Sequence, residues 1–184
     1  MAPPVTKRAL RRAAVWCCIV YAAICVILFF AQRSLLFLPT RNLPVSRLEP
    51  WGIDGVAVGY CREVSSPNTV WLMMHGNAGQ ASDRGYVLEH LSADDVVYVL
   101  EYPGYGARDG SPSRSSIDAA ARQAYNNLRR LYPQTSVCVI GESIGSGPAA
   151  MLATSQQPPD KFVPITPFDT LYRVAAKRFF FLPV

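Results

Sequence analysis

Three short segments of apolar and aromatic side chains constrain the fold more than any other feature of the sequence. They are residues 70–74, 96–100 and 137–140, with the sequences VWLMM, VVYVL and VCVI. Runs of this length without charged residues are typical of strands that are buried on both faces. Segments with helical spacing of apolar residues separate them. The sequence therefore predicts an α/β fold whose mostly parallel sheet has helices on both faces.

Glycine, proline and capping serines delimit the other predicted elements. In chain order these are one or two strands within 51–64 broken at Gly55 and Gly59, a short helix capped by Ser82 and ending near Leu91, a glycine-rich loop at 103–112, a helix capped by Ser115 or Ser116 and ending at Leu131, a helix at 146–154, and an edge or irregular strand at 162–165 that contains Pro164.

The residues Gly141, Glu142, Ser143, Ile144 and Gly145 directly follow the third apolar segment. In a G-x-S-x-G motif the serine occupies a tight strand-to-helix corner, and the glycines keep other Cβ atoms away from its hydroxyl. The alternative is a glycine-rich turn with a capping serine. The apolar strand before the motif and the small-residue helix after it favour a nucleophile elbow. Ser143 is therefore the predicted catalytic nucleophile.

The same reasoning predicts an oxyanion hole made of backbone amides. The N–H of Ile144 lies at a helix start, where negative charge is favoured. The second donor should come from the loop after the first apolar strand, at the backbone of Asn77. His75, in the same loop, is either the catalytic base or a side chain that orders the loop. We favour the second role. In proteins with a G-x-S-x-G elbow the catalytic triad follows the chain order Ser, acid, His, whereas His75 precedes Ser143. His90 is expected on the surface of a helix.

An uncharged apolar run, residues 13–31, precedes the predicted sheet. Its 19 residues would span about 28 Å as a helix, close to the hydrocarbon thickness of about 30 Å. Four basic residues lie before the run, and no acidic residue occurs before Glu49. By the positive-inside rule we expect a single-pass membrane protein with residues 1–12 in the cytoplasm. The domain that follows is then translocated, into the periplasm if the source is bacterial.

A cleaved signal peptide is the alternative interpretation of residues 13–31. Its apolar region would be shorter and would end in small residues. This run instead ends close after the bulky pair Phe29 and Phe30. We therefore expect a retained anchor, a linker at 32–50 and an α/β domain at 51–184.

The composition argues against several classes of partner. The formal net charge is +5, from 18 basic and 13 acidic residues, and four of the basic residues lie within 1–12. No basic stripe is interleaved with aromatic residues, so we expect no nucleic-acid partner. The five cysteines and two histidines lack the spacing of metal ligands. The loop at 75–79 lacks the Lys-Ser/Thr of a phosphate-binding loop. We therefore expect no metal and no cofactor.

Several motifs occur in a fixed order, namely HGNAG at 75–79, EYPGYGARDGSPS at 101–113, GESIGSGPA at 141–149, TPFDTL at 166–171 and, before them, QRSLLFLP at 32–39. Together they resemble the membrane-anchored α/β-hydrolase domain proteins of the serine aminopeptidase-like group, which includes lipid and acyl-thioester hydrolases. The resemblance covers nearly the whole chain. It implies an α/β-hydrolase fold, Ser143 as nucleophile, and the backbone of Asn77 and Ile144 as the oxyanion hole. It also implies a lipid-like or acylated substrate.

The catalytic triad of that group is incomplete in this sequence. The acid and the histidine of the group follow later strands, whereas His75 and His90 both precede Ser143. Asp169 is a candidate for the acid, but its motif fits better with a structural aspartate that caps the next helix. The chain ends in the apolar sequence FFFLPV, which favours a domain truncated at its C-terminus. The segment 51–184 is then the N-terminal part of the hydrolase domain.

Two functions follow from these observations. When complete, the protein hydrolyses acyl esters or thioesters through Ser143. Alternatively, it is a catalytically inactive, membrane-tethered binding or vestigial protein, because no histidine follows Ser143. A scaffold that offers the 103–112 loop to a partner is a third interpretation. Glu101, Asp109 and Glu142 are expected to be loop or supporting carboxylates.

Overall fold

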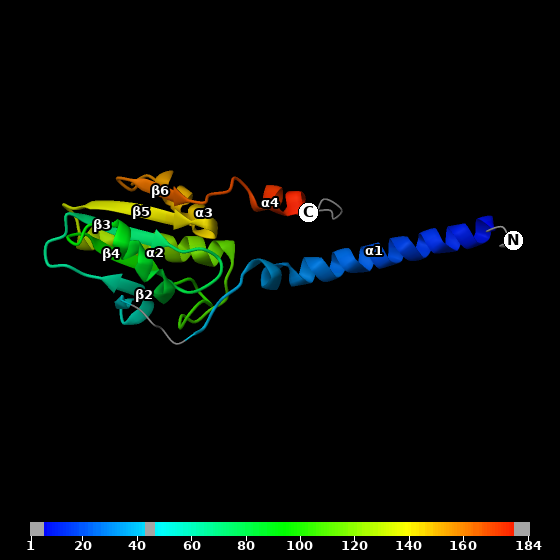
Figure 1. Ribbon diagram of the computed structural model, residues 1–184, viewed down its shortest axis with the longest axis horizontal. Coiled ribbons are helices and arrows are strands. Elements are labelled where there is room, and N and C mark those ends of the chain that lie inside the picture. Colours follow the sequence, from blue (N-terminus) through cyan, green and yellow to red (C-terminus); the bar gives the residue numbers. More distant parts are fainter. Residues whose placement is uncertain (1–5, 43–46, 179–184) are drawn as a thin grey trace. The chain divides into compact units, whose positions relative to one another are not determined.

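The computed structural model describes residues 6–42 and 47–178. The chain divides into two units, Phe37–Asp169 on the one hand and Met1–Leu36 with Thr170–Val184 on the other. The first unit contains the sheet and its covering helices, and the second contains the two terminal helices (Figure 1). Each unit is described by itself.

The larger unit is built on one six-stranded sheet with the strand order β1-β2-β4-β3-β5-β6. The strands are β1 (Glu49–Ile53), β2 (Val56–Arg62), β3 (Thr69–Met74), β4 (Val96–Leu100), β5 (Ser136–Glu142) and β6 (Phe162–Ile165). Strands β4, β3, β5 and β6 are parallel to one another. The β1–β2 hairpin joins β4 in the antiparallel sense. The sheet is therefore mixed but mostly parallel, as predicted.

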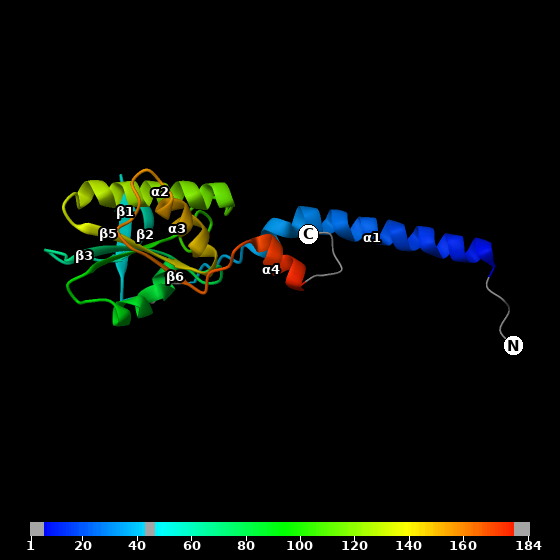
Figure 2. The same cartoon turned by 90° about the horizontal axis from the view of Figure 1, so that it is seen from above.

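The three apolar segments form the centre of this sheet. All five residues of β4 are buried, and β3 and β5 are buried over most of their length. One face holds a cluster that includes Met73, Val97, Val99 and Ile140, packed with Val87 of the helix η1. Figure 2 shows α2 (Arg114–Leu131) and α3 (Ser146–Ala153) over one face and η1 (Ala81–His90, green) over the other. Helices thus cover both faces, as the continuous apolar strands require.

Two predicted helix caps were wrong by a few residues. Helix α2 is capped by Ser113 rather than Ser115 or Ser116, because Ser113 Oγ accepts from Ser116 N at 3.0 Å. The Ser116 hydroxyl oxygen accepts in return from Ser113 N at 2.9 Å, which completes a reciprocal capping box.

The helix expected from Ser82 is a 3₁₀ helix with Gln80 at its cap position. Asp83 Oδ2 accepts from the Gln80 N–H at 3.2 Å. The Gln80 carboxamide donates to the buried Ser82 hydroxyl at 2.9 Å. Ser82 lies inside the helix and binds the Gln80 side chain, so the cap position belongs to Gln80.

The expected break at Gly55 is present, but the expected break at Gly59 is not. Gly55 has φ +79° and forms the turn between β1 and β2. Gly59 lies inside β2 and pairs with Leu100. A Cβ at position 59 would collide with the carbonyl oxygen of Val99. Here glycine permits a close approach of two strands instead of ending one.

The smaller unit contains α1 (Lys7–Leu36) and α4 (Leu171–Arg178). Helix α1 has 30 residues, no buried residue, and a length and composition that would allow it to cross a membrane. It is longer than the predicted segment 13–31 at both ends. Helix α1 continues to Leu36 and β1 begins at Glu49, so both extend into the segment 32–50 that the sequence analysis assigned to a linker. Pro39 explains the helix end, since the residues before a proline avoid helical backbone angles.

Candidate functional site

The carboxyl ends of the parallel strands bring the candidate site residues to one edge of the sheet. Met74 at the end of β3 pairs with Gly141 of β5 and with Leu100 of β4. Glu142 pairs in turn with Ile165 at the end of β6. The loops after these strands therefore begin at the same level, which is where open α/β sheets bind their ligands.

Ser143 has a backbone conformation that is rare for a residue with a side chain. Its φ is +49°, and it begins the 3₁₀ turn Ser143–Gly145 between β5 and α3. A non-glycine residue in this region costs on the order of 1–3 kcal/mol and persists only where the surroundings impose it. The Ser146 hydroxyl donates to the carbonyl oxygen of Gly141 at 2.9 Å, which ties the corner together from inside. This is the strand–turn–helix geometry that the G-x-S-x-G motif requires.

The two glycines of the motif are sites of close contact. A Cβ at Gly141 would lie 2.7 Å from the Cβ of Ala149 on α3. A Cβ at Gly145 would collide with the carbonyl oxygen of Met74 and lie 2.8 Å from that of His75. The turn that carries Ser143 is therefore pressed against the start of the loop that follows β3. We call residues 75–80 the 75–80 loop.

Glu142 and Arg84 hold the 75–80 loop against the turn. Glu142 Oε2 accepts from the Gly76 N–H at 2.9 Å and lies 3.1 Å from Nε of Arg84. The Arg84 guanidinium donates to the carbonyl oxygen of Ala78 at 2.6 Å. The side chains of Arg84 and Glu142 are 13% and 23% exposed, so this ion pair is shielded from much of the solvent. Glu142 is thus a supporting carboxylate. The sequence analysis did not identify Arg84, because no local pattern connects it to the motif.

The Asn77 side chain has a structural role in the loop. Its Oδ1 accepts from the Leu38 N–H at 3.1 Å and from the Tyr105 hydroxyl at 2.7 Å. Burial raises the pKa of Tyr105 to about 12, so this hydroxyl remains a donor at neutral pH. These two bonds fix the Asn77 side chain, and the backbone N–H of Asn77 stays the predicted oxyanion donor at this position. Ile144, the other predicted donor, directly follows Ser143 in the turn.

His75 is fully buried in a hydrogen-bonded cluster. Its Nδ1 lies 2.7 Å from the carbonyl oxygen of Gly76, and its Nε2 lies 3.2 Å from Oε1 of Glu101. The ring stacks on Tyr102 with 4.2 Å between the ring centroids. Because a carbonyl oxygen can only accept, Nδ1 donates to Gly76, and Nε2 faces the Glu101 carboxylate at hydrogen-bonding distance. Both nitrogens are engaged, which supports the loop-ordering role of His75.

Glu101 connects this cluster to the neighbouring segments. Its Oε2 accepts from the Ala81 N–H at 3.0 Å at the start of η1. Its carbonyl oxygen accepts from the Arg108 guanidinium at 2.6 Å. Burial lowers the pKa of Arg108, and the Glu101 carboxylate opposes this shift. The glycine-rich loop at 103–112 is thereby tied to the 75–80 loop. The sequence motif indicated the loop but not these partners.

Asp169 and His90 are both exposed. At the start of α4 the Thr170 hydroxyl oxygen accepts from the Arg173 N–H at 3.2 Å, so Thr170 itself caps that helix. Among residues 6–42 and 47–178, no group of three or more His, Cys, Asp or Glu side chains could hold a metal ion. The cysteines of this part of the chain are free, including the buried Cys61 and Cys138.

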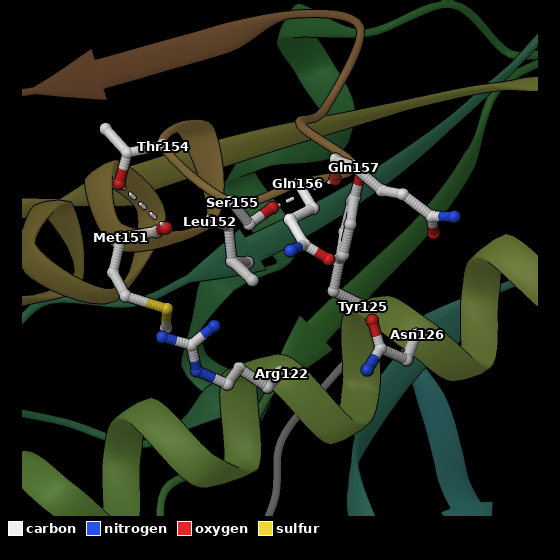
Figure 3. A pocket seen from close by; sticks show the side chains of 9 residues that line it. All are labelled: Arg122, Tyr125, Asn126, Met151, Leu152, Thr154, Ser155, Gln156 and Gln157. Carbon is white, nitrogen blue, oxygen red and sulfur yellow. Dashed lines mark hydrogen bonds between the residues drawn. The ribbon is translucent and has the colours of Figure 1, made fainter.

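Figure 3 shows a cavity of about 460 Å³ between α2 and the end of α3. It is lined by residues of α2, the end of α3 and the following loop, namely Arg122, Tyr125, Asn126, Met151, Leu152, Thr154, Ser155, Gln156 and Gln157. Helix α3 begins at Ser146, next to the turn, whereas its lining residues begin at Met151. The cavity is therefore separate from the candidate site.

Comparisons with known proteins bear on the fold. No family model matches the chain. An uncharacterised protein of Mycobacterium tuberculosis is 28% identical over 182 residues, which cover 90% of this chain and 64% of that protein. The lysophosphatidylserine lipase ABHD12 of Xenopus tropicalis is 28% identical over 119 residues, 61% of this chain and 31% of the lipase. The chain thus spans less than two thirds of the length of either relative.

Among solved structures, the esterase Pf2001 of Pyrococcus furiosus superposes with a TM-score of 0.57 at 20% identity. The match covers 80% of this chain and 63% of the esterase. At this identity the likeness concerns the fold alone. With the sheet order and the helices on both faces, it shows that the chain has the α/β-hydrolase fold.

Proposed function

We propose that the protein is a membrane-anchored serine hydrolase that cleaves acyl esters or thioesters of lipid-like substrates through Ser143. The observation that carries the proposal is the left-handed backbone of Ser143, φ +49°, on a tight turn between β5 and α3. Strain of this kind is concentrated at functional sites. The lipase among the relatives supports a lipid-like substrate.

The proposed reaction is acyl transfer in two steps. Ser143 Oγ attacks the acyl carbonyl carbon, and its proton passes to a general base. Backbone N–H groups of Ile144 and Asn77 stabilise the negative oxygen of the tetrahedral intermediate. Collapse of the intermediate releases the alcohol or thiol, which takes the proton from the base. Water, deprotonated by the same base, then attacks the acyl-serine; the base returns the proton to Ser143 Oγ as the carboxylic acid leaves, which restores both groups.

The proposal places the general base outside residues 1–184. His75 is occupied by Gly76 and Glu101, and His90 lies on the surface of η1. In this fold the acid and the histidine follow the nucleophile. The relatives are longer than the segment that matches this chain, which leaves room for both groups. Asp169 stays a candidate for the acid, and residues 51–184 correspond to the N-terminal part of the domain.

For the membrane we propose that residues 13–31 span the bilayer as part of α1. The absence of charge in this run and the length of α1 support this assignment. The basic residues within 1–12 support a cytoplasmic location for this flank, with the hydrolase domain on the other side.

A fluorophosphonate probe tests the proposed nucleophile, because it reacts with activated serines. We expect the native protein to be labelled on the peptide that contains Ser143, and Ser143→Ala to abolish labelling. Ser136→Ala, at the exposed start of β5, is the matched control and should be labelled normally. Labelling that persists in Ser143→Ala would refute the assignment. A folded native protein that is not labelled would favour the inactive, membrane-tethered alternative.

A further inference from the structure

Residues 37–42, which follow the end of α1, run along the 75–80 loop. Leu38 N donates to Asn77 Oδ1 at 3.1 Å, and Pro39 pairs with Gly79 in a parallel β-bridge. Thr40 Oγ1 accepts from the Gly79 N–H at 3.1 Å. The contact continues at Gln80, whose carboxamide exchanges two hydrogen bonds of 3.1 Å with the backbone of Asn42.

The other side of this segment contacts the glycine-rich loop. The Thr40 carbonyl oxygen accepts from the Gly106 N–H at 2.9 Å. The Arg41 guanidinium lies at hydrogen-bonding distance, 3.4 Å, from the carbonyl oxygen of Gly104. Phe37 anchors the segment, because it is only 7% exposed. Thr40 therefore bridges the two loops, with its hydroxyl on one and its carbonyl on the other.

The restraints on the 75–80 loop have two sources. The hydrolase domain holds Gly76 and Ala78 through Glu142 and Arg84. Residues 37–42 hold Asn77, Gly79 and Gln80. Gly79 has φ +95°, a conformation open to glycine but costly in entropy to fix. Its N–H needs a fixed acceptor, which Thr40 supplies.

Accurate placement matters because an oxyanion donor acts only at close range. Donors must lie about 2.7–3.1 Å from the developing oxyanion, and a misplacement of about 1 Å can lower the rate about 100-fold. The predicted donor at Asn77 lies between loop residues that are held from two sides. If residues 37–42 no longer held the 75–80 loop, the Asn77 backbone would lie between two glycines, Gly76 and Gly79, on a less restrained loop.

We propose that residues 37–42 are a positioning element of the oxyanion hole, with Thr40 as the key residue. This inference rests on the proposed function of Ser143. Residues 37–42 belong to the larger unit and directly follow Leu36, the last residue of α1. Thr40 is a positioning residue in this scheme, because it acts through the backbone of the 75–80 loop.

The test compares Thr40→Val with Thr40→Ser in the native membrane-embedded protein, with p-nitrophenyl butyrate as substrate. Valine keeps the shape of threonine but cannot accept the hydrogen bond from Gly79. We expect kcat to fall about tenfold or more with little change in KM, since oxyanion donors act in the transition state. Thr40→Ser should restore most of kcat. Thr154→Val is the matched control, because this hydroxyl bonds only to carbonyls of its own helix among its described contacts.

Hydrogen exchange of the 75–80 loop gives a readout that does not depend on activity. Thr40→Val should speed exchange of the Gly79 amide, while Thr154→Val should not. Unchanged exchange and unchanged kcat in Thr40→Val would each overturn the inference, as would a loss of kcat that Thr40→Ser does not restore. Failure of the proposed function looks different, because the wild type would then lack turnover that depends on Ser143. The exchange experiment would still decide whether residues 37–42 hold the loop.

Discussion

The strain at Ser143 predicts that removal of its side chain stabilises the folded protein. Ser143→Ala keeps a Cβ, so it keeps the cost of φ +49°, whereas Ser143→Gly removes that cost. A left-handed conformation costs an L-residue about 1–2 kcal/mol. Glycine loses about 0.5–1 kcal/mol more conformational freedom on folding. The difference leaves Ser143→Gly more stable than Ser143→Ala by about 0.5–1 kcal/mol.

Denaturation of the two variants measures this difference directly. Both lack the hydroxyl, so the comparison is free of any contribution from catalysis. We expect the melting temperature of Ser143→Gly to be roughly 1–4 °C higher than that of Ser143→Ala. Urea unfolding followed by tryptophan fluorescence should agree, provided that the slope of the unfolding free energy against urea is the same in both.

Ser146 supplies a control of opposite sign in the same turn. It has a right-handed helical backbone with φ −65° and ψ −27°. There Ser146→Gly should be less stable than Ser146→Ala by about 0.5–1 kcal/mol, because glycine is unfavourable in a helix. Both variants lose the hydrogen bond to Gly141, so that loss cancels. If Ser143→Ala proves as stable as Ser143→Gly while the Ser146 pair behaves as expected, the turn stores no strain.

Three further perturbations test other parts of the site. Glu142→Gln keeps an acceptor for the Gly76 N–H but removes the charge opposite Arg84. We expect kcat to fall several-fold and the Ala78 amide to exchange faster. An unchanged kcat would contradict the role of the ion pair. Ten glycine and serine residues inserted between Leu36 and Phe37 should leave turnover of a soluble ester unchanged, because residues 37–42 keep their own contacts with the 75–80 loop; a fall in turnover as large as that of Thr40→Val would show that these contacts depend on α1. Burial raises the pKa of the Cys61 thiol to about 11, so at pH 8 only about one thiol in 1,000 is ionised; iodoacetamide should modify Cys61 only after unfolding, and rapid modification of the folded protein would show that this strand opens.

Long-range contacts explain the parts of the site that the sequence did not predict. The partnership of Arg84 with Glu142, and that of Glu101 with His75, depends on which strands are neighbours in the sheet. Glu101 and His75 are 26 positions apart in the chain, and Arg84 and Glu142 are 58 apart. No spacing rule along the sequence relates them. The same holds for Thr40 and Gly79, which are 39 positions apart.

The sequence by itself determined the elements whose signals are local. Continuous apolar runs specify β3, β4 and β5, because strands buried on both faces cannot carry charge. The motif around Ser143 specified the tight turn. Its two glycines lie where neighbouring segments leave no room for a Cβ. The uncharged run at 13–31 contains no proline or glycine, and it lies within the continuous helix α1.

Only the tertiary structure decided how these elements meet. It placed Gly59 inside a strand, since Val99 of the neighbouring strand leaves no room for a side chain. It placed residues 37–42 against the 75–80 loop, a contact that the assignment of these residues to a linker did not predict. A residue's role in such places depends on the atoms that the fold brings to it, and those atoms come from other strands and loops.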